Sequence, residues 1–248
     1  MKFQIFLVFV ILMAAVHSSA AEKRIFLTTT EYKPFCSMDL KNQGAAAQIV
    51  KQAFKKTGYR VKMEFYPWKR CLEMAKMGVS DGVAFLWYAK EREEWFLFSD
   101  PLGLPNIMGF YKRSDRRIRF RNYDDLAPHV IGYIYGFAYP REFYAASARL
   151  RCRYFYSHTE LMENLVSGKI DLALIGRHQA EYILKTRFPE HIRDFDFMEP
   201  AVEIREHFIA VSRKVEDFDT KVADFNRGLH MIRKDGTLER ILLQHGMK

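Results

Sequence analysis

The chain has 248 residues, of which 49% are hydrophobic, so it can bury a real core and is not a disordered or fibrous protein. Lys and Arg outnumber Asp and Glu by 39 to 30, and this net charge of +9 would ordinarily point to nucleic acid or an anionic surface. The densest basic run, residues 113–121, is read as a solvated loop, with a docking patch as the alternative.

The first 21 residues are typical of a secretory signal peptide. Lys2 precedes an apolar run over residues 5–16, which is too short to cross a membrane, and small residues follow up to Ala21. We expect cleavage after Ala20 or Ala21, a periplasmic mature protein and therefore no nucleic-acid partner. An uncleaved membrane anchor is the alternative.

Strand and helix patterns alternate through the first hundred residues. Residues 24–30 and 61–65 read as strands, and a helical stripe over residues 46–54 lies between them. A second helix begins at Trp68 and ends before Gly78, and a buried strand follows at residues 83–87. This order predicts βα units with a largely parallel sheet.

One phrase occurs twice: a helix, a glycine, two further residues, an aspartate and an apolar strand. It runs through Gly78 and Asp81, and again through Gly168 and Asp171, which suggests two lobes built on one plan. Ser157 and Glu160 form a candidate capping box for the second of these helices. A long amphipathic helix over residues 218–232 and a last helix at 238–243 end the chain.

These residues carry a resemblance to the family 3 extracellular solute-binding proteins, which include amino-acid receptors of ABC transporters. The most specific pieces are Glu91 and Arg92 followed by FSDP at residues 98–101, the two Gly–Asp phrases, and DGTLERIL at residues 235–242. The resemblance implies an α/β fold of the type II periplasmic-binding-protein class, with a ligand cleft between two α/β lobes. It places lobe 1 at 22–105 and 205–248, lobe 2 at 106–204, and the crossing segments near 102–106 and 203–207.

The resemblance also implies ligand-binding residues in lobe 1. Arg92 follows a buried strand and offers a planar fork of donors that matches a carboxylate. Tyr32 and Trp68 match aromatic walls of the cleft, and Trp87, at the end of the buried strand, is a further ligand-binding candidate. The alternatives are a surface arginine in a charged turn and aromatic residues of the core.

In lobe 2 the resemblance implicates Gly136, Phe137 and Ala138, where backbone donors meet the ligand. At three positions this chain departs from the amino-acid receptors: Ala89 and Phe137 replace hydroxyl residues, and Gly176 replaces the carboxylate that holds an α-ammonium. A buried ammonium without a counter-ion is costly, so an ordinary α-amino acid is doubtful. Arg177, next to Gly176, is a further candidate, either as a contact to an anionic ligand or as a solvated helix start.

Three cysteines enter an oxidising compartment, and none has metal-site spacing. Cys36 and Cys71 both lie near residues assigned to the cleft, so a disulfide between them is the preferred pairing. Cys152 would then remain free.

The expected function is capture of a small, carboxylate-bearing solute by a monomeric protein that delivers it to an inner-membrane ABC permease. We expect no cofactor, no metal and no catalysis, since nucleophile, phosphate-loop and zinc motifs are missing from the sequence. A cleft enzyme resembling cyclohexadienyl dehydratase, with Glu142 or Glu181 as its acid, is one alternative. A ligand sensor for a membrane kinase is the other.

Overall fold

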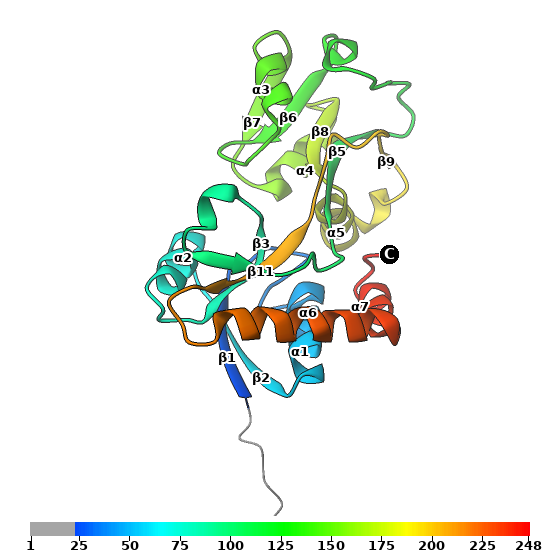
Figure 1. Ribbon diagram of the computed structural model, residues 1–248. Coiled ribbons are helices and arrows are strands. Elements are labelled where there is room, and N and C mark those ends of the chain that lie inside the picture. Colours follow the sequence, from blue (N-terminus) through cyan, green and yellow to red (C-terminus); the bar gives the residue numbers. More distant parts are fainter. Residues whose placement is uncertain (1–22) are drawn as a thin grey trace, which may run out of the picture.

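The computed structural model describes residues 23–248, and the expected signal peptide lies outside this range. Figure 1 shows two α/β bodies stacked one above the other, with the N-terminal strand and the C-terminal helices together in the lower body. Within residues 23–248, no helix combines the length and the apolar character needed to cross a membrane.

The lower body is built on one five-stranded sheet. Its strand order is β2-β1-β3-β11-β4; β1 is parallel to β2 and β3, whereas β11 is antiparallel to β3 and β4. Helices α1 and α6 cover one face of this sheet and α2 covers the other. Its elements are β1 (Lys23–Thr29), η1 (Lys41–Gln43), α1 (Ala45–Lys56), β2 (Tyr59–Phe65), α2 (Trp68–Lys76), β3 (Gly82–Trp87), η2 (Lys90–Arg92), β4 (Phe96–Phe98), β11 (His207–Ser212), α6 (Phe218–Lys234) and α7 (Thr237–Gln244).

The upper body has a second sheet of the order β10-β5-β8-β6-β7, with β9 paired to β5. Strand β6 is parallel to β7 and β8, and β5 is antiparallel to β8 and β10. Its elements are β5 (Asn106–Arg113), η3 (Tyr123–Leu126), β6 (Val130–Ile134), α3 (Arg141–Ser147), β7 (Arg151–Phe155), α4 (His158–Val166), β8 (Leu172–Gly176), α5 (Arg177–Arg187), η4 (Pro189–His191), β9 (Phe195–Phe197) and β10 (Glu203–Arg205).

The repeated Gly–Asp phrase has the same structure in both bodies. Gly78 and Gly168 follow α2 and α4 with φ values of 76° and 70°, a conformation that glycine adopts readily. Asp81 then accepts a hydrogen bond from the backbone N–H of Phe26 at 2.6 Å, and Asp171 accepts one from Val130 at 2.8 Å. Each aspartate therefore ties the start of a buried strand to the neighbouring strand.

Two segments connect the bodies. Residues 99–105 lead from β4 to β5, and Glu206 alone separates β10 from β11. The side chain of His207 joins the two connections, because its Nδ1 lies 2.9 Å from the carbonyl oxygen of Leu104. The crossing segments expected at 102–106 and 203–207 overlap these connections, while the division into 22–105 and 205–248 against 106–204 stays a prediction.

The predicted disulfide is wrong, since Cys36, Cys71 and Cys152 are all free thiols. Cys36 packs in the cluster on the α1 face of the lower sheet, whereas Cys71 packs on the α2 face. Cys71 Sγ donates instead to the carbonyl oxygen of Thr29 at 3.0 Å, and Cys36 Sγ lies 3.8 Å from the Thr29 hydroxyl. Proximity to the cleft in sequence does not place two side chains on one face of a sheet.

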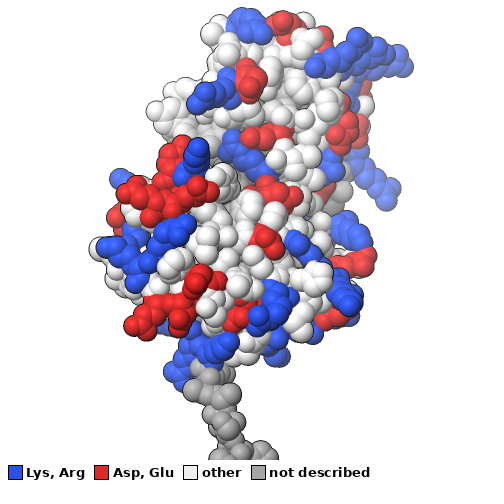
Figure 2. Space-filling model, viewed as in Figure 1, with Lys and Arg blue, Asp and Glu red and all other residues white. Residues whose placement is uncertain are grey.

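The basic run is a loop after β5, and its arginines 116, 117, 119 and 121 are exposed. Arg113 pairs with Asp115 at 3.1 Å. Figure 2 shows Lys and Arg side chains projecting from the edge of the upper body. This agrees with the reading of the run as a solvated loop.

Candidate functional site in the cleft

A cavity of about 720 Å³ lies between the two bodies. The loop after β1 lines it from below, with Glu31, Tyr32, Lys33 and Asp39. From above it is lined by the first turn of α4, with His158 and Thr159, and by α5 along most of its length, with Gln179, Tyr182, Ile183, Thr186 and Arg187. Both helix starts follow strands of the upper sheet, as expected for a cleft at the carboxyl ends of parallel strands.

Three predicted residues lie where the bodies touch. The Tyr32 hydroxyl accepts a hydrogen bond from Gln179 Nε2 at 2.6 Å, and burial raises the pKa of Tyr32 well above its usual range. The rings of Trp87 and Phe137 meet edge to face, with centroids 5.6 Å apart. Phe137 also packs edge to face on His158 at 5.6 Å. These contacts form an aromatic wall that spans both bodies.

Arg92 is half-buried at the end of η2. Its Nη1 donates to the carbonyl oxygen of Trp87 at 2.9 Å, and its guanidinium carbon lies 5.2 Å from the centre of the Trp68 ring. Within residues 23–248, no carboxylate comes within the 4.0 Å ion-pair distance of this side chain. Burial lowers the pKa of the guanidinium, which still remains charged at neutral pH.

The other predicted residues are placed differently. Gly136, with φ of 72°, and Ala138 are exposed in the turn after β6, and the Phe137 carbonyl already accepts a bond from the Tyr144 hydroxyl at 2.6 Å. Arg177 packs over the Phe197 ring at 4.2 Å and pairs with Glu199. Arg177 therefore has a local partner in the upper body. Of the predicted residues only Tyr32 lines the cavity itself; Arg92, Trp87 and Phe137 lie outside its lining, as Arg177 does.

His207, the first residue of β11, is buried beside the two crossing segments and was not a predicted site residue. Its ring stacks on Phe85 at a centroid distance of 3.8 Å, and Phe85 has a φ of 61°, which is unusual for a bulky side chain. Trp87 Nε1 donates to His207 Nε2 at 2.8 Å, so Nδ1 carries the proton and donates to Leu104. Burial lowers the pKa of His207 to about 4 and keeps the ring neutral.

Arg205, also missed, extends this wall from the crossing strand. Its guanidinium carbon lies 4.8 Å from the centre of the Trp87 ring, and its Nε donates to Glu203 at 2.6 Å. The only sequence signal for Arg205 and His207 was their position within the predicted crossing segment.

Residues 23–248 contain no group of three or more His, Cys, Asp or Glu side chains suited to hold a metal ion. The polar groups of the cavity are the Tyr32 phenol, the Gln179 amide and the neutral imidazole of His158, together with the charged side chains of Glu31, Lys33, Asp39 and Arg187. This donor and acceptor set can orient a small polar molecule between aromatic walls.

Two α/β bodies joined by two crossing segments, with a cavity between them, define a type II periplasmic binding protein. The sequence matches the bacterial extracellular solute-binding proteins, family 3, over residues 25–248, and the chain belongs to this family. None of the curated protein sequences matches it.

Several solved structures share the fold at low identity. Substrate binding domain 2 of GlnP from Lactococcus lactis, in an open conformation, is 17% identical with a TM-score of 0.71, and the match covers 91% of this chain and 96% of that one. A histidine kinase sensor domain similar to periplasmic binding proteins is 17% identical with a TM-score of 0.66, over 90% and 96%. An ancestral amino acid-binding protein, a precursor of cyclohexadienyl dehydratase, is 20% identical with a TM-score of 0.64, over 89% and 94%.

Proposed function

We propose that this protein is a periplasmic receptor that binds a small carboxylate in its cleft and delivers it unchanged to an ABC permease. The observation that carries the proposal is Arg92, a half-buried guanidinium without a carboxylate partner in the described chain. It lies against Trp87, whose ring reaches Phe137 of the opposite body. An anion held by Arg92 would therefore sit at the junction of the two bodies.

The charge on Arg92 favours an anionic ligand for a simple energetic reason. A partly desolvated cation gains most from an anion that also accepts its N–H bonds, and a carboxylate fits the two-pronged guanidinium. Arg205, the other guanidinium near Trp87, already donates to Glu203. Of the two, Arg92 is the one free to take a ligand carboxylate.

Binding without chemistry is supported by the state of the titratable groups in the cleft. His207 is neutral and both of its ring nitrogens are engaged, so it has no free nitrogen for proton transfer. Of the two acids considered for a dehydratase, Glu142 is exposed on α3, and Glu181 lies 3.3 Å from His178.

Delivery to a permease is supported by family membership and by the transport systems named among similar structures. The expected signal peptide supports a periplasmic location, and the two-bodied form suits a monomer that closes on its ligand. A sensor role for a membrane kinase would use the same cleft with a different partner.

The test is a calorimetric titration of small carboxylates into the wild type and Arg92→Ala. We expect Arg92→Ala to lower the affinity by about 100-fold, which corresponds to about 2.7 kcal/mol for a lost bidentate contact. Arg213→Ala is a matched control, because Arg213 also donates to a backbone carbonyl and lies over an aromatic ring, 5.6 Å from the centre of Phe218. Equal affinities of Arg92→Ala and Arg213→Ala would contradict the proposal.

A further inference from the structure

Two buried amide side chains at the cleft have oxygens that accept no hydrogen bond. Asn106 begins β5 and Gln179 lies in the first turn of α5, and each is only 2% exposed. Neither Asn106 Oδ1 nor Gln179 Oε1 has a donor within residues 23–248. Native proteins rarely leave buried acceptors without donors, so this pair points to a donor from outside the chain.

Both oxygens converge on Gly176. A Cβ atom at this position would lie 1.7 Å from Gln179 Oε1 and 2.6 Å from Asn106 Oδ1. The backbone does not require glycine here, since φ is −67°, so the glycine serves to make room for the two amides. The pair is held at the cleft by the bond from Gln179 Nε2 to Tyr32 of the opposite body.

The unpartnered buried side-chain atoms of residues 23–248 are all acceptors. Besides the two amide oxygens they are Oε2 of Glu203 and Oε2 of Glu206, which lie in and next to the crossing strand. The cleft and its crossing segment therefore need hydrogen-bond donors rather than acceptors.

The amide pair itself carries no negative charge. Gly176 contributes no side chain, and the strand neighbour of Asn106 is the cation Arg205. Glu203, two residues before Arg205, is neutralised by the bond from Arg205 Nε at 2.6 Å. A neutral NH₂ group would satisfy the two amide oxygens with two N–H donors and needs no counter-ion, whereas a buried ammonium would need one, and the remaining carboxylate of the crossing segment is Glu206.

Resting on the proposed carboxylate receptor, we propose that the ligand carries a neutral NH₂ group, a carboxamide or ureido group, which binds Asn106 and Gln179. Arg92 holds the carboxylate end of the same molecule. The missing charge at Gly176 thereby becomes a specificity determinant that selects amide-bearing carboxylates over compounds that present an ammonium at this position.

The test compares three end groups on matched carbon chains. Monoamides (malonamate, succinamate and glutaramate) are titrated beside the corresponding diacids and the ω-amino acids of equal length. We expect the best monoamide to bind at least about tenfold more tightly than its diacid and its amino acid. An amino acid or diacid that binds as tightly as its monoamide would overturn the inference.

Gln179→Glu provides the reciprocal test, because it replaces a neutral amide, whose oxygen accepts hydrogen bonds, by a charged carboxylate acceptor of nearly the same shape. In Gln179→Glu we expect the affinity for the amino acids to rise at least about tenfold and the affinity for the monoamides to fall. The control Gln52→Glu on α1 adds the same charge and should change neither affinity. If Gln179→Glu does not fold, Asn106→Asp makes the same comparison. An unchanged preference in a folded variant would also overturn the inference.

The two proposals fail in different ways. Diacids that bind through Arg92, without preference for the amides, would leave the receptor function intact and remove only the amide subsite. Binding by none of these compounds, or binding that does not depend on Arg92, would contradict the receptor proposal and the subsite with it.

Discussion

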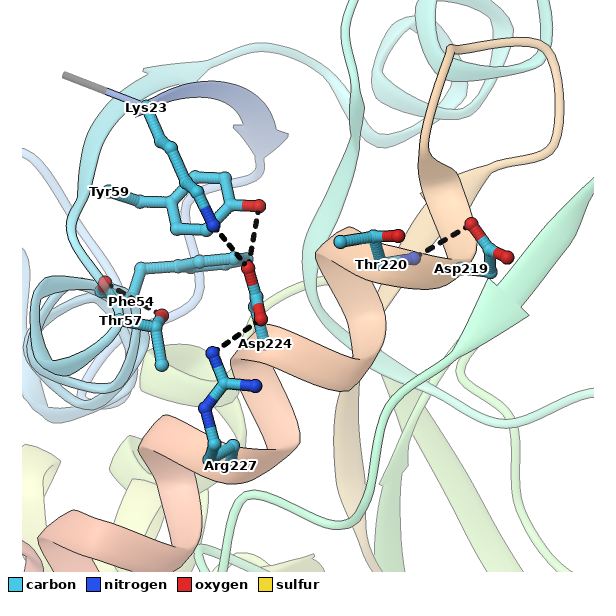
Figure 3. A network of polar contacts seen from close by, with 8 residues as sticks. All are labelled: Lys23, Phe54, Thr57, Tyr59, Asp219, Thr220, Asp224 and Arg227. Carbon is cyan, nitrogen blue, oxygen red and sulfur yellow. Dashed lines mark hydrogen bonds and ion pairs between the residues drawn. The ribbon is translucent and has the colours of Figure 1, made fainter. Parts of the chain in front are cut away.

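At the scale of single residues, the most tightly connected buried charge is Asp224 on α6, shown in Figure 3. It is 4% exposed and accepts hydrogen bonds from Lys23 at 2.9 Å, the Tyr59 hydroxyl at 3.0 Å and Arg227 at 2.6 Å. Burial alone would raise the pKa of Asp224, but the bonds from Lys23 and Tyr59 and the charge of Arg227 outweigh it and lower the pKa. This carboxylate therefore ties the first strand, β2 and α6 together.

Asp224→Ala should reduce the free energy of unfolding by about 2 kcal/mol, because it leaves the buried Tyr59 hydroxyl without its acceptor. The pKa of Asp224 is lower in the folded protein than in the unfolded chain. Its contribution to stability is therefore fully present above the pKa of the unfolded chain and is lost as the pH falls through the pKa of the folded protein. Urea denaturation at neutral pH measures the loss. Asp219→Ala on the same helix, where the carboxylate is exposed, should change stability by less than about 0.5 kcal/mol; equal losses would contradict this role of Asp224.

Two histidines of the cleft should make stability depend on pH. Burial lowers the pKa of His158 and of His207 to about 4 each, so the unfolded chain binds more protons between that value and about 6.5. Stability should therefore fall as the pH drops through this window, by about 1 kcal/mol per unit for each histidine. His207→Phe, measured by urea denaturation from pH 7 to 4.5, should reduce the slope by about half. A slope equal to that of the wild type would show that His207 is not buried in its neutral form.

The candidate site was only partly predictable from the sequence. Tyr32, Trp87, Phe137 and Arg92 were predicted because they follow strands or match a family pattern, and their role in ligand binding stays a prediction. His207, Asn106 and Gln179 lie in crossing segments or on a buried helix turn, where no periodic pattern marks a cleft. Their contacts depend on how two bodies meet, and that meeting is not encoded in local spacing.

At the scale of elements, the order of strands and helices was predicted well. The expected strand at residues 83–87 is β3 (Gly82–Trp87), and the expected last helix at 238–243 is α7 (Thr237–Gln244). The capping box at α4 is only half confirmed: Ser157 accepts from the Glu160 N–H at 3.1 Å, but Glu160 accepts from Tyr156 rather than Ser157. Periodicity finds elements because burial repeats with the geometry of each, whereas side-chain partners depend on the exact path of the chain.

The glycine that ends α4 offers a test at this scale. Gly168→Ala should destabilise the protein by about 1 kcal/mol, because φ is 70° and the added methyl meets no atom within 4 Å, so only the backbone conformation is penalised. Gly168→Asn should cost less, since asparagine adopts this conformation more readily. Thermal unfolding of both variants measures the difference. If alanine is no worse than asparagine, the turn does not depend on the left-handed conformation.

At the scale of the whole molecule, three side-chain pairs join the lower body to the upper one: Tyr32 with Gln179, Trp87 with Phe137, and Phe35 with His178. The short connections are joined by His207 and Leu104, so rotation about them can open the cavity while each sheet stays intact. Sequence predicted two bodies because the Gly–Asp phrase occurs twice. The identity of the ligand was not predictable from the shared pattern, and we propose that it depends on replaced positions such as Gly176.

The most direct test of this account is calorimetric titration of the purified protein with small carboxylates, followed by mass spectrometry of the recovered ligand. We predict saturable binding to one site, loss of that binding in Arg92→Ala, and recovery of the ligand chemically unchanged. Binding that survives in Arg92→Ala, or a ligand that is converted during the titration, would contradict it.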